Sequence, residues 1–282
     1  MVTMAEIQAM FQAETIGGYD FSGSPELVTC ARSAEAVLRD AGEVDAAQWN
    51  KVQEGFLERA RHKEMYPLKH LEQVREKDGA FFAARGPLRG SVLDIGGGWG
   101  LYREWWAPEA SSLFVVHDPG VERHVRGPYT TNRQCYEKAF AKPMTFVEGL
   151  GEVMPYKNDT FDTALITATL DHCADPARVL KESFRCLKPG GVMLVLQSCH
   201  EPRPIQTGVH LLGRVARLAT SPRKLVQKVR KRMFGPPVHL HHFTVPGLIE
   251  LFRAARFEQV TSRPVYRDVY ALEGVKPPAL SQ

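Results

Sequence analysis

The chain has 282 residues, of which 44% are hydrophobic, and a formal net charge of +4. This length fits one large α/β domain with additions, or one domain with a small cap. No run of about 18 apolar residues occurs and no basic segment precedes an apolar stretch at the N-terminus, so neither a membrane span nor a signal peptide is expected. The five cysteines form no C-x-x-C pair, which disfavours disulfides and structural zinc and favours a cytoplasmic protein.

The first 88 residues predict a helical N-terminal cap or lid. Ser24-Pro25 has the form of an N-cap followed by proline at the first helical position, which predicts a helix through Leu27 and Ala31. The expected helices lie over 24–42, 45–60 and near 68–74, with a break at Gly86-Pro87.

From Ser91 onward, short apolar runs alternate with helical segments, which is typical of βαβ units around a parallel sheet. Asp175-Pro176 and Thr244 predict the starts of two helices, and the last two strands are expected to pair antiparallel. The prediction is an α/β fold: a Rossmann-like, doubly wound mixed sheet of about seven strands in a domain over 89–282, with a basic helical insert at 201–238 after the fifth strand. The expected strands are 92–95, 113–117, 145–148, 162–167, 191–197, 257–262 and 266–272.

The segment VLDIGGGWG, residues 92–100, joins an apolar strand to an acidic residue and a glycine-rich turn. Glycines permit sharp turns and close approach of the backbone to a ligand. Asp94 would repel the pyrophosphate of a dinucleotide but suits a ligand that carries cationic groups. The spacing G-x-G-x-G also differs from the dinucleotide fingerprint. The alternative is a strand-to-helix turn that merely requires glycine.

A second strand, ending at His117-Asp118, places a carboxylate 20 residues after Gly98. An acid at this point can accept hydrogen bonds from both hydroxyls of a ribose. The alternative is an ordinary strand-end turn, since Pro119-Gly120 follows.

These motifs, together with EVMPYKNDTFD, LDHCADP and LKPGG in the same order, resemble the class I S-adenosylmethionine-dependent methyltransferases, in particular the small-molecule (type 11-like) subgroup. The resemblance spans roughly Ser91 to Cys199 and says little about the substrate. One departure is Leu150, where many members have an aspartate that bonds the adenine amine. The resemblance implies S-adenosyl-L-methionine as cofactor, with Asp94 near the methionine ammonium, Asp118 on the ribose and a cofactor-binding set of Asp94, Gly96, Gly97, Gly98, Asp118, Pro119, Leu150, Gly151, Glu152 and Thr167.

Methyl transfer from a sulfonium needs mainly positioning, plus removal of a proton where the acceptor carries one. His172, after the fourth strand, is the first candidate general base, followed by Asp171 and by His200 after the fifth strand. Each of them could instead have a purely structural role. The run His239-Leu240-His241-His242 lacks an accompanying carboxylate or cysteine at ligand spacing, so no metal site is predicted.

The segment from Glu201 to Val238 holds nine Lys or Arg residues and one acid, which gives it a charge of +8 and leaves −4 for the rest of the chain. Apolar residues alternate with these cations over 211–232. One interpretation is a surface for anionic lipid or a phosphate-bearing carrier, and another is a cap that holds an anionic small substrate. The third interpretation of this segment is a solvated lid.

The leading hypothesis is therefore a cytoplasmic methyltransferase acting on an oxygen of a small molecule, a sugar or a lipid-linked biosynthetic intermediate. A nucleic-acid methyltransferase is an alternative through the basic insert, although Thr167-Ala168-Thr169-Leu170 stands where base-amine methylases carry Asn/Asp-Pro-Pro-aromatic. A non-catalytic cofactor-binding or scaffold protein is the third hypothesis. A nicotinamide-dependent oxidoreductase is disfavoured by Asp94 and by the glycine spacing.

Overall fold

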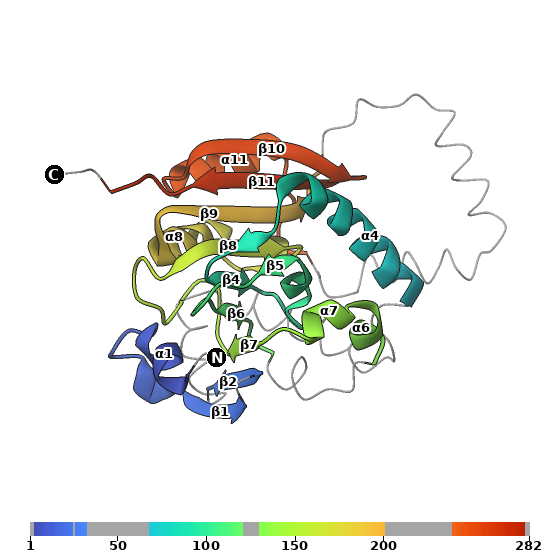
Figure 1. The fold of residues 1–282 in the computed structure, drawn as a ribbon. Coiled ribbons are helices and arrows are strands. Elements are labelled where there is room, and N and C mark those ends of the chain that lie inside the picture. Colours follow the sequence, from blue (N-terminus) through green and yellow to red (C-terminus); the bar gives the residue numbers. More distant parts are fainter. Residues whose placement is uncertain (1–2, 25, 33–67, 121–129, 201–238, 280–282) are drawn as a thin grey trace, which may run out of the picture.

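A computed structural model describes residues 3–24, 26–32, 68–120, 130–200 and 239–279. Its centre is a sheet of nine strands in the order β1-β2-β7-β6-β4-β8-β9-β11-β10. Figure 1 shows β1 and β2 at one end of this row of strands and β10 and β11 at the other. The strands are β1 (Asp20–Ser24), β2 (Leu27–Ala31), β4 (Val92–Ile95), β6 (Phe114–His117), β7 (Met144–Val147), β8 (Phe161–Thr167), β9 (Leu187–Ser198), β10 (Glu258–Tyr266) and β11 (Val269–Val275).

The six strands from β2 to β9 in this order run parallel, and the outer strands β1, β11 and β10 are antiparallel to their neighbours. The parallel strands are apolar on both faces, as sheets covered on both sides require. Because all six run the same way, the residues that follow β4, β6, β8 and β9 gather at one edge of the sheet.

Alternate residues of each strand enter two different cores. Leu93, Ile95 and Ile166 pack on one face with α1 (Met4–Ala9), α8 (Pro176–Cys186) and α11 (Val245–Ala254). Val92 and Leu165 pack on the other face with Phe81 and Phe82 of α4 (Leu68–Arg85). The sheet is therefore covered by helices on both faces, as a doubly wound fold requires.

The helix starts follow the capping signals in the sequence. The Asp175 side chain accepts a hydrogen bond from the Arg178 amide at the start of α8, and Thr244 accepts one from the Gly247 amide at the start of α11. Both helices carry proline in their first turn, where a missing N–H does no harm. The shorter elements are η1 (Ile16–Gly18), β3 (Leu88–Arg89), η2 (Leu101–Trp105), β5 (Trp106–Ala107), α6 (Thr130–Cys135), α7 (Glu137–Phe140) and η3 (Leu170–His172).

All seven expected strands and the antiparallel final pair are confirmed, but the count of about seven is too low. The two additional strands come from the N-terminal region, where a helix through Leu27 and Ala31 was the wrong prediction. Leu27–Ala31 is instead β2, with Val28 and Cys30 buried, and it extends the parallel sheet beyond β7. The β-branched and apolar run Leu-Val-Thr-Cys suits a strand buried on both faces, and this outweighs the N-cap signal at Ser24.

The helix expected near 68–74 is present as the first part of α4, which ends at Arg85, just before the predicted break. The helix expected over 45–60 and the basic segment 201–238 lie outside the described residues. Among the described residues, no helix combines the length and the apolar character that a bilayer crossing needs.

Candidate active site at the carboxyl edge of the sheet

Asp94 is a buried carboxyl group at the end of the central strand β4. It is fully buried, and among the described residues neither of its oxygens has a hydrogen-bond partner. Burial raises the pKa of Asp94 to about 8, the nearby Asp118 adds to the rise, and Arg103 opposes it. Because an unpaired buried carboxylate is costly, the arrangement fits a cationic group that the protein itself does not supply.

The glycine turn packs directly against this carboxyl group. A Cβ atom on Gly97 would lie 2.3 Å from Cγ of Asp94, so a side chain there would displace the carboxylate. Gly96 has a φ of 66°, and its Cβ would lie 2.1 Å from Cγ2 of Thr169. Both positions therefore require glycine for steric reasons. The absent side chain of Gly97 leaves the place that the Asp94 carboxyl group occupies, and we call this close contact the Gly97 cradle.

Asp118, at the end of β6, holds two turns together. Its Oδ2 accepts a hydrogen bond of 3.3 Å from the Gly98 amide, and its Oδ1 accepts one of 2.8 Å from the Gly120 amide. Pro119, the residue between Asp118 and Gly120, is half-buried. The structure thus joins Gly98, Asp118 and Pro119 in one place, next to the glycine turn, while ribose binding by Asp118 remains a prediction.

The loop of Leu150, Gly151 and Glu152 follows β7 at the same edge of the sheet. Burial raises the pKa of Glu152, although its Oε1 accepts hydrogen bonds of 2.9 Å from the Ala174 amide and 3.3 Å from the Asp175 amide. Its carboxylate therefore fixes the loop against the start of α8. This indicates that Glu152 positions the backbone at this edge of the sheet.

Asp171 and His172 lie in η3, which begins shortly after Thr167 at the end of β8. The Asp171 side chain is buried, its Oδ2 is hydrogen-bonded to Nδ1 of His239, and its Oδ1 lies 3.8 Å from Nε2 of His172. The His172 and His239 rings lie face to face with centroids 4.8 Å apart. The Leu240 amide donates to the Asp171 carbonyl at 2.8 Å, which holds the segment after residue 238 against η3.

His200 contacts other residues of the segment 239–243 than Asp171 and His172 do. Its amide donates to the Phe243 carbonyl at 2.7 Å, and its ring lies 5.2 Å from the ring of His242. The segment 239–243 thus contacts both of the loops predicted to carry a base, the one after β8 and the one after β9. The sequence analysis identified Asp171 and His172 but assigned no acidic partner to His239, because Asp171 and His239 are 68 positions apart in the chain.

Comparison with known proteins places residues 93–195 in the family described as "Methyltransferase domain". Residues 93–195 form a methyltransferase domain. This match confirms the resemblance to methyltransferases that the sequence showed. The matched range begins on β4 and ends within β9, so it contains Asp94, the glycine turn, Asp118 and the Asp171–His172 pair.

Relatives match over the same part of the chain. The 2-methyl-6-phytyl-1,4-hydroquinone methyltransferase 2 of Oryza sativa is 31% identical over 112 residues, 39% of this chain and 29% of that protein. An uncharacterized methyltransferase of Mycobacterium tuberculosis is 28% identical over 109 residues, 39% of each chain. A solved SAM-dependent methyltransferase from Aquifex aeolicus is 14% identical, covers 74% of this chain and 98% of its own, and superposes with a TM-score of 0.46. The chain thus spans well under half the length of the curated relatives.

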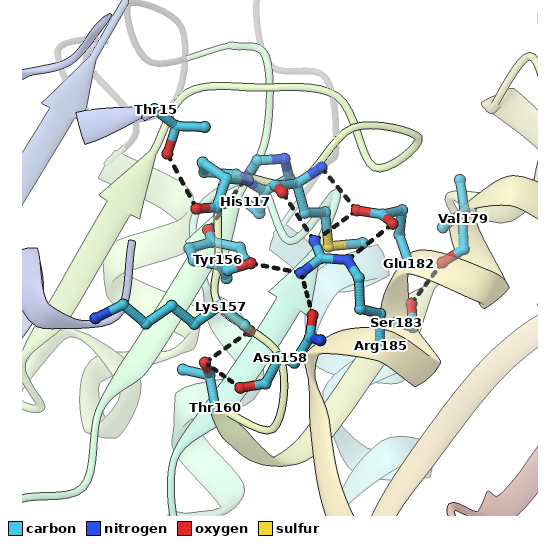
Figure 2. Close-up of polar contacts among 12 residues, drawn as sticks. Thr15, His117, Tyr156, Lys157, Asn158, Thr160, Val179, Glu182, Ser183 and Arg185 are labelled. Atoms are coloured by element: carbon cyan, nitrogen blue, oxygen red, sulfur yellow. Dashed lines mark hydrogen bonds and ion pairs between the residues drawn. The ribbon is translucent and has the colours of Figure 1, made fainter. Parts of the chain in front are cut away.

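A polar network that the sequence analysis missed supports the 150–158 loop of the methyltransferase domain. His117 is buried, and its ring nitrogens contact the Leu150 carbonyl at 2.9 Å and the Tyr156 hydroxyl at 3.0 Å. Figure 2 shows Arg185 of α8 reaching the carbonyl groups of this loop while it pairs with Glu182. The available signal was His117 itself, a polar residue within an apolar strand immediately before Asp118.

Proposed function

We propose that the protein is an S-adenosylmethionine-dependent methyltransferase that methylates an oxygen of a small molecule, a sugar or a lipid-linked intermediate. The observation that carries the proposal is Asp94, whose two buried oxygens have no partner among the described residues, beside the Gly97 cradle. A carboxylate here matches the ammonium of the cofactor's methionine end and opposes a pyrophosphate.

The residues that would hold the cofactor follow from their positions along the sheet edge. Asp94 would bind the ammonium group, Asp118 with Pro119 the ribose, Leu150 to Glu152 the adenine, and Thr167 the methionine side. When bound, the cofactor supplies a methyl group on a positively charged sulfur, which is already an activated donor. The protein's task is then to orient the acceptor oxygen and to take its proton.

For the proton we propose His172, Asp171 and His200 as candidates, and we add His239. Asp171 accepts a hydrogen bond from Nδ1 of His239, which would leave Nε2 of that ring to act as a base. Asp171 itself is then a positioning residue.

The relatives' names support a small-molecule acceptor. One is a methyltransferase for 2-methyl-6-phytyl-1,4-hydroquinone, and a Dictyostelium discoideum relative, 26% identical over 102 residues, is a 2-methoxy-6-polyprenyl-1,4-benzoquinol methylase. Both names describe aromatic hydroxyl compounds with a long isoprenoid chain. We propose that the basic segment 201–238, which directly precedes His239, faces an anionic or lipid-linked acceptor. All five cysteines are free thiols, which fits the cytoplasm.

The test is transfer of label from isotope-labelled S-adenosylmethionine into an extract, separated into lipid, small aqueous and macromolecular fractions. Label in the lipid or small aqueous fraction that disappears with Asp94→Asn supports the proposal. Label in nucleic acid would favour the alternative acceptor class. Binding of S-adenosylhomocysteine without transfer to any fraction would favour a non-catalytic role, and binding of NADH in its place would refute the cofactor.

A further inference from the structure

Asp171, His172 and His239 present one ligand atom each, and these three atoms all lie within 4.8 Å of one another. Two imidazole nitrogens and one carboxylate oxygen form a donor set that suits zinc and neighbouring divalent transition metals rather than Mg²⁺ or Ca²⁺. We propose that this cluster binds one divalent transition-metal ion, with Zn²⁺ as its first occupant.

A second observation, independent of the spacing, also indicates a ligand. The Asp171 side chain is 9% exposed, and its Oδ1 has no hydrogen-bond partner among the described residues. That oxygen lies toward His172, at 3.8 Å from Nε2, which is too long for a hydrogen bond. Such a buried oxygen is costly without a partner, and a metal ion at this point would satisfy it.

The backbone fixes the cluster from both sides. His172 is held in η3 by its amide, which donates to the Thr169 carbonyl at 2.9 Å, and the amides of Leu240 and His241 both donate to the Asp171 carbonyl. His239 is therefore anchored next to Asp171, although it is distant in sequence, while its side chain remains 53% exposed. This combination allows the ring to rotate without unfolding the segment that carries it.

Zinc binding requires only a small movement of the three ligand atoms. Zinc binds nitrogen and oxygen at about 2.0–2.2 Å in a tetrahedral site, which places ligand atoms about 3.4 Å apart. The widest separation in the cluster must close by roughly 1.4 Å, which side-chain rotations of His239 and His172 can supply. Three protein ligands leave the fourth position open, which is typical of a catalytic zinc site.

The negative charge around the cluster favours a cation. The carboxylate of Glu152 lies close to the cluster, because its Oε1 accepts hydrogen bonds from the amides of Ala174 and Asp175, which follow His172 in the chain. With both histidines neutral, the three ligands carry one negative charge, and a divalent ion would reduce the net negative charge of this region.

The site itself does not depend on the proposed function, but its role in the reaction rests on it. An acceptor hydroxyl at the open position would be acidified, as water is by zinc. Its O–H bond would then break with the electron pair left on oxygen and the proton passed to solvent, so that the bound metal would replace the base role proposed above for Asp171, His172 and His239.

The experiment is direct metal binding by the full chain, purified with a tag that contains no histidine. After treatment with a chelator, the protein is titrated with Zn²⁺ against a chromophoric chelator and with Co²⁺ followed by its visible absorption. We expect one ion per chain and the intense absorption of tetrahedral cobalt. Asp171→Ala and His239→Gln should each weaken binding by more than about 100-fold, beyond the effect of losing an outer-shell partner.

Two control variants keep the outcome unambiguous. His242→Gln removes an exposed neighbour that is paired with His200 instead, and it should bind zinc like the wild type. Asp94→Asn should lose S-adenosylhomocysteine binding yet keep the metal, which separates this inference from the proposed function. Because Asp171→Ala could unfold the chain, His239→Gln decides the matter. The absence of stoichiometric binding, or equal binding by His239→Gln and the wild type, overturns the metal site and leaves a hydrogen-bonded Asp171–His239 pair.

Discussion

Replacing Asp94 by asparagine should have opposite effects on binding and on stability. The substitution keeps the shape of the side chain but removes the charge that we assign to the cofactor's ammonium. Removing one partner of a buried ion pair costs about 3–5 kcal/mol. At pH 8.5, where the wild-type carboxyl is ionised, the affinity for S-adenosylhomocysteine should therefore fall by roughly 100- to 4,000-fold.

The effect on the stability of the cofactor-free protein follows from the pKa of Asp94. This pKa is about 8 in the folded protein, whereas the ordinary value of an aspartate, which applies to the unfolded chain, is 3.8. Between those values the unfolded chain ionises while the folded chain keeps its proton, so rising pH favours the unfolded state. Above pH 8, this difference in pKa lowers the free energy of unfolding of the wild type by about 6 kcal/mol. Asparagine avoids this loss, but its buried amide costs roughly 1–3 kcal/mol.

The free energy of unfolding of Asp94→Asn should therefore exceed that of the wild type at pH 8.5, by about 3–5 kcal/mol, and lose this advantage at pH 4.5. Urea denaturation at the two pH values measures it, and isothermal titration calorimetry with S-adenosylhomocysteine measures the affinity. Asp20→Asn is the matched control, because Asp20 is an exposed carboxylate on β1. Binding within threefold of the wild type, or an equal stability difference at both pH values, would refute the reasoning.

Three further substitutions test the cradle and the scaffold. Gly97→Ala places a Cβ 2.3 Å from Cγ of Asp94 and should weaken S-adenosylhomocysteine binding at least tenfold by calorimetry, whereas Gly18→Ala, with nothing within 4 Å, should leave it unchanged. Asp175→Ala removes the N-cap of α8 and should lower the free energy of unfolding by about 1 kcal/mol in urea. Phe252→Ala, fully buried under the sheet, should lower it by about 3–5 kcal/mol, and a loss below about 1 kcal/mol would contradict the packing described for α11.

The central sheet was predictable because its information is local. Each of the strands β4, β6, β7, β8 and β9 is an apolar run bounded by turn residues, and the caps at Asp175 and Thr244 fixed the helix starts. The β1–β2 hairpin was not predictable in this way, because Ser24-Pro25 carries a valid helix signal and only pairing with β7, more than 110 residues later, makes Leu27–Ala31 a strand. Tertiary pairing outweighed the local signal there.

For the site, too, the residues of a local motif could be predicted and the long-range contacts could not. Asp94 and the glycines follow from one motif, so their place at the end of β4 could be predicted from the sequence. His239 could not be paired with Asp171 in advance, since nothing local relates a histidine in 239–243 to the loop after β8. The support given by His117, Tyr156 and Arg185 to the 150–158 loop could likewise not be predicted, because it depends on three segments that meet only in the folded chain.

The distinction between a supporting and a ligand-binding carboxylate rests on its partners. Asp118 and Glu152 accept hydrogen bonds from backbone amides of the turns they join, so their burial is compensated within the protein. Asp78 of α4 is also buried, but the Tyr102 hydroxyl donates to its Oδ2 at 2.8 Å, which anchors α4 to η2. Among the described residues, Asp94 is the one carboxyl group with both oxygens buried and unpaired. Because the protein leaves this cost uncompensated at the end of its central strand, a bound cation would stabilise it there. For this reason we propose Asp94, and not the equally buried Asp78, as the cofactor-binding carboxylate.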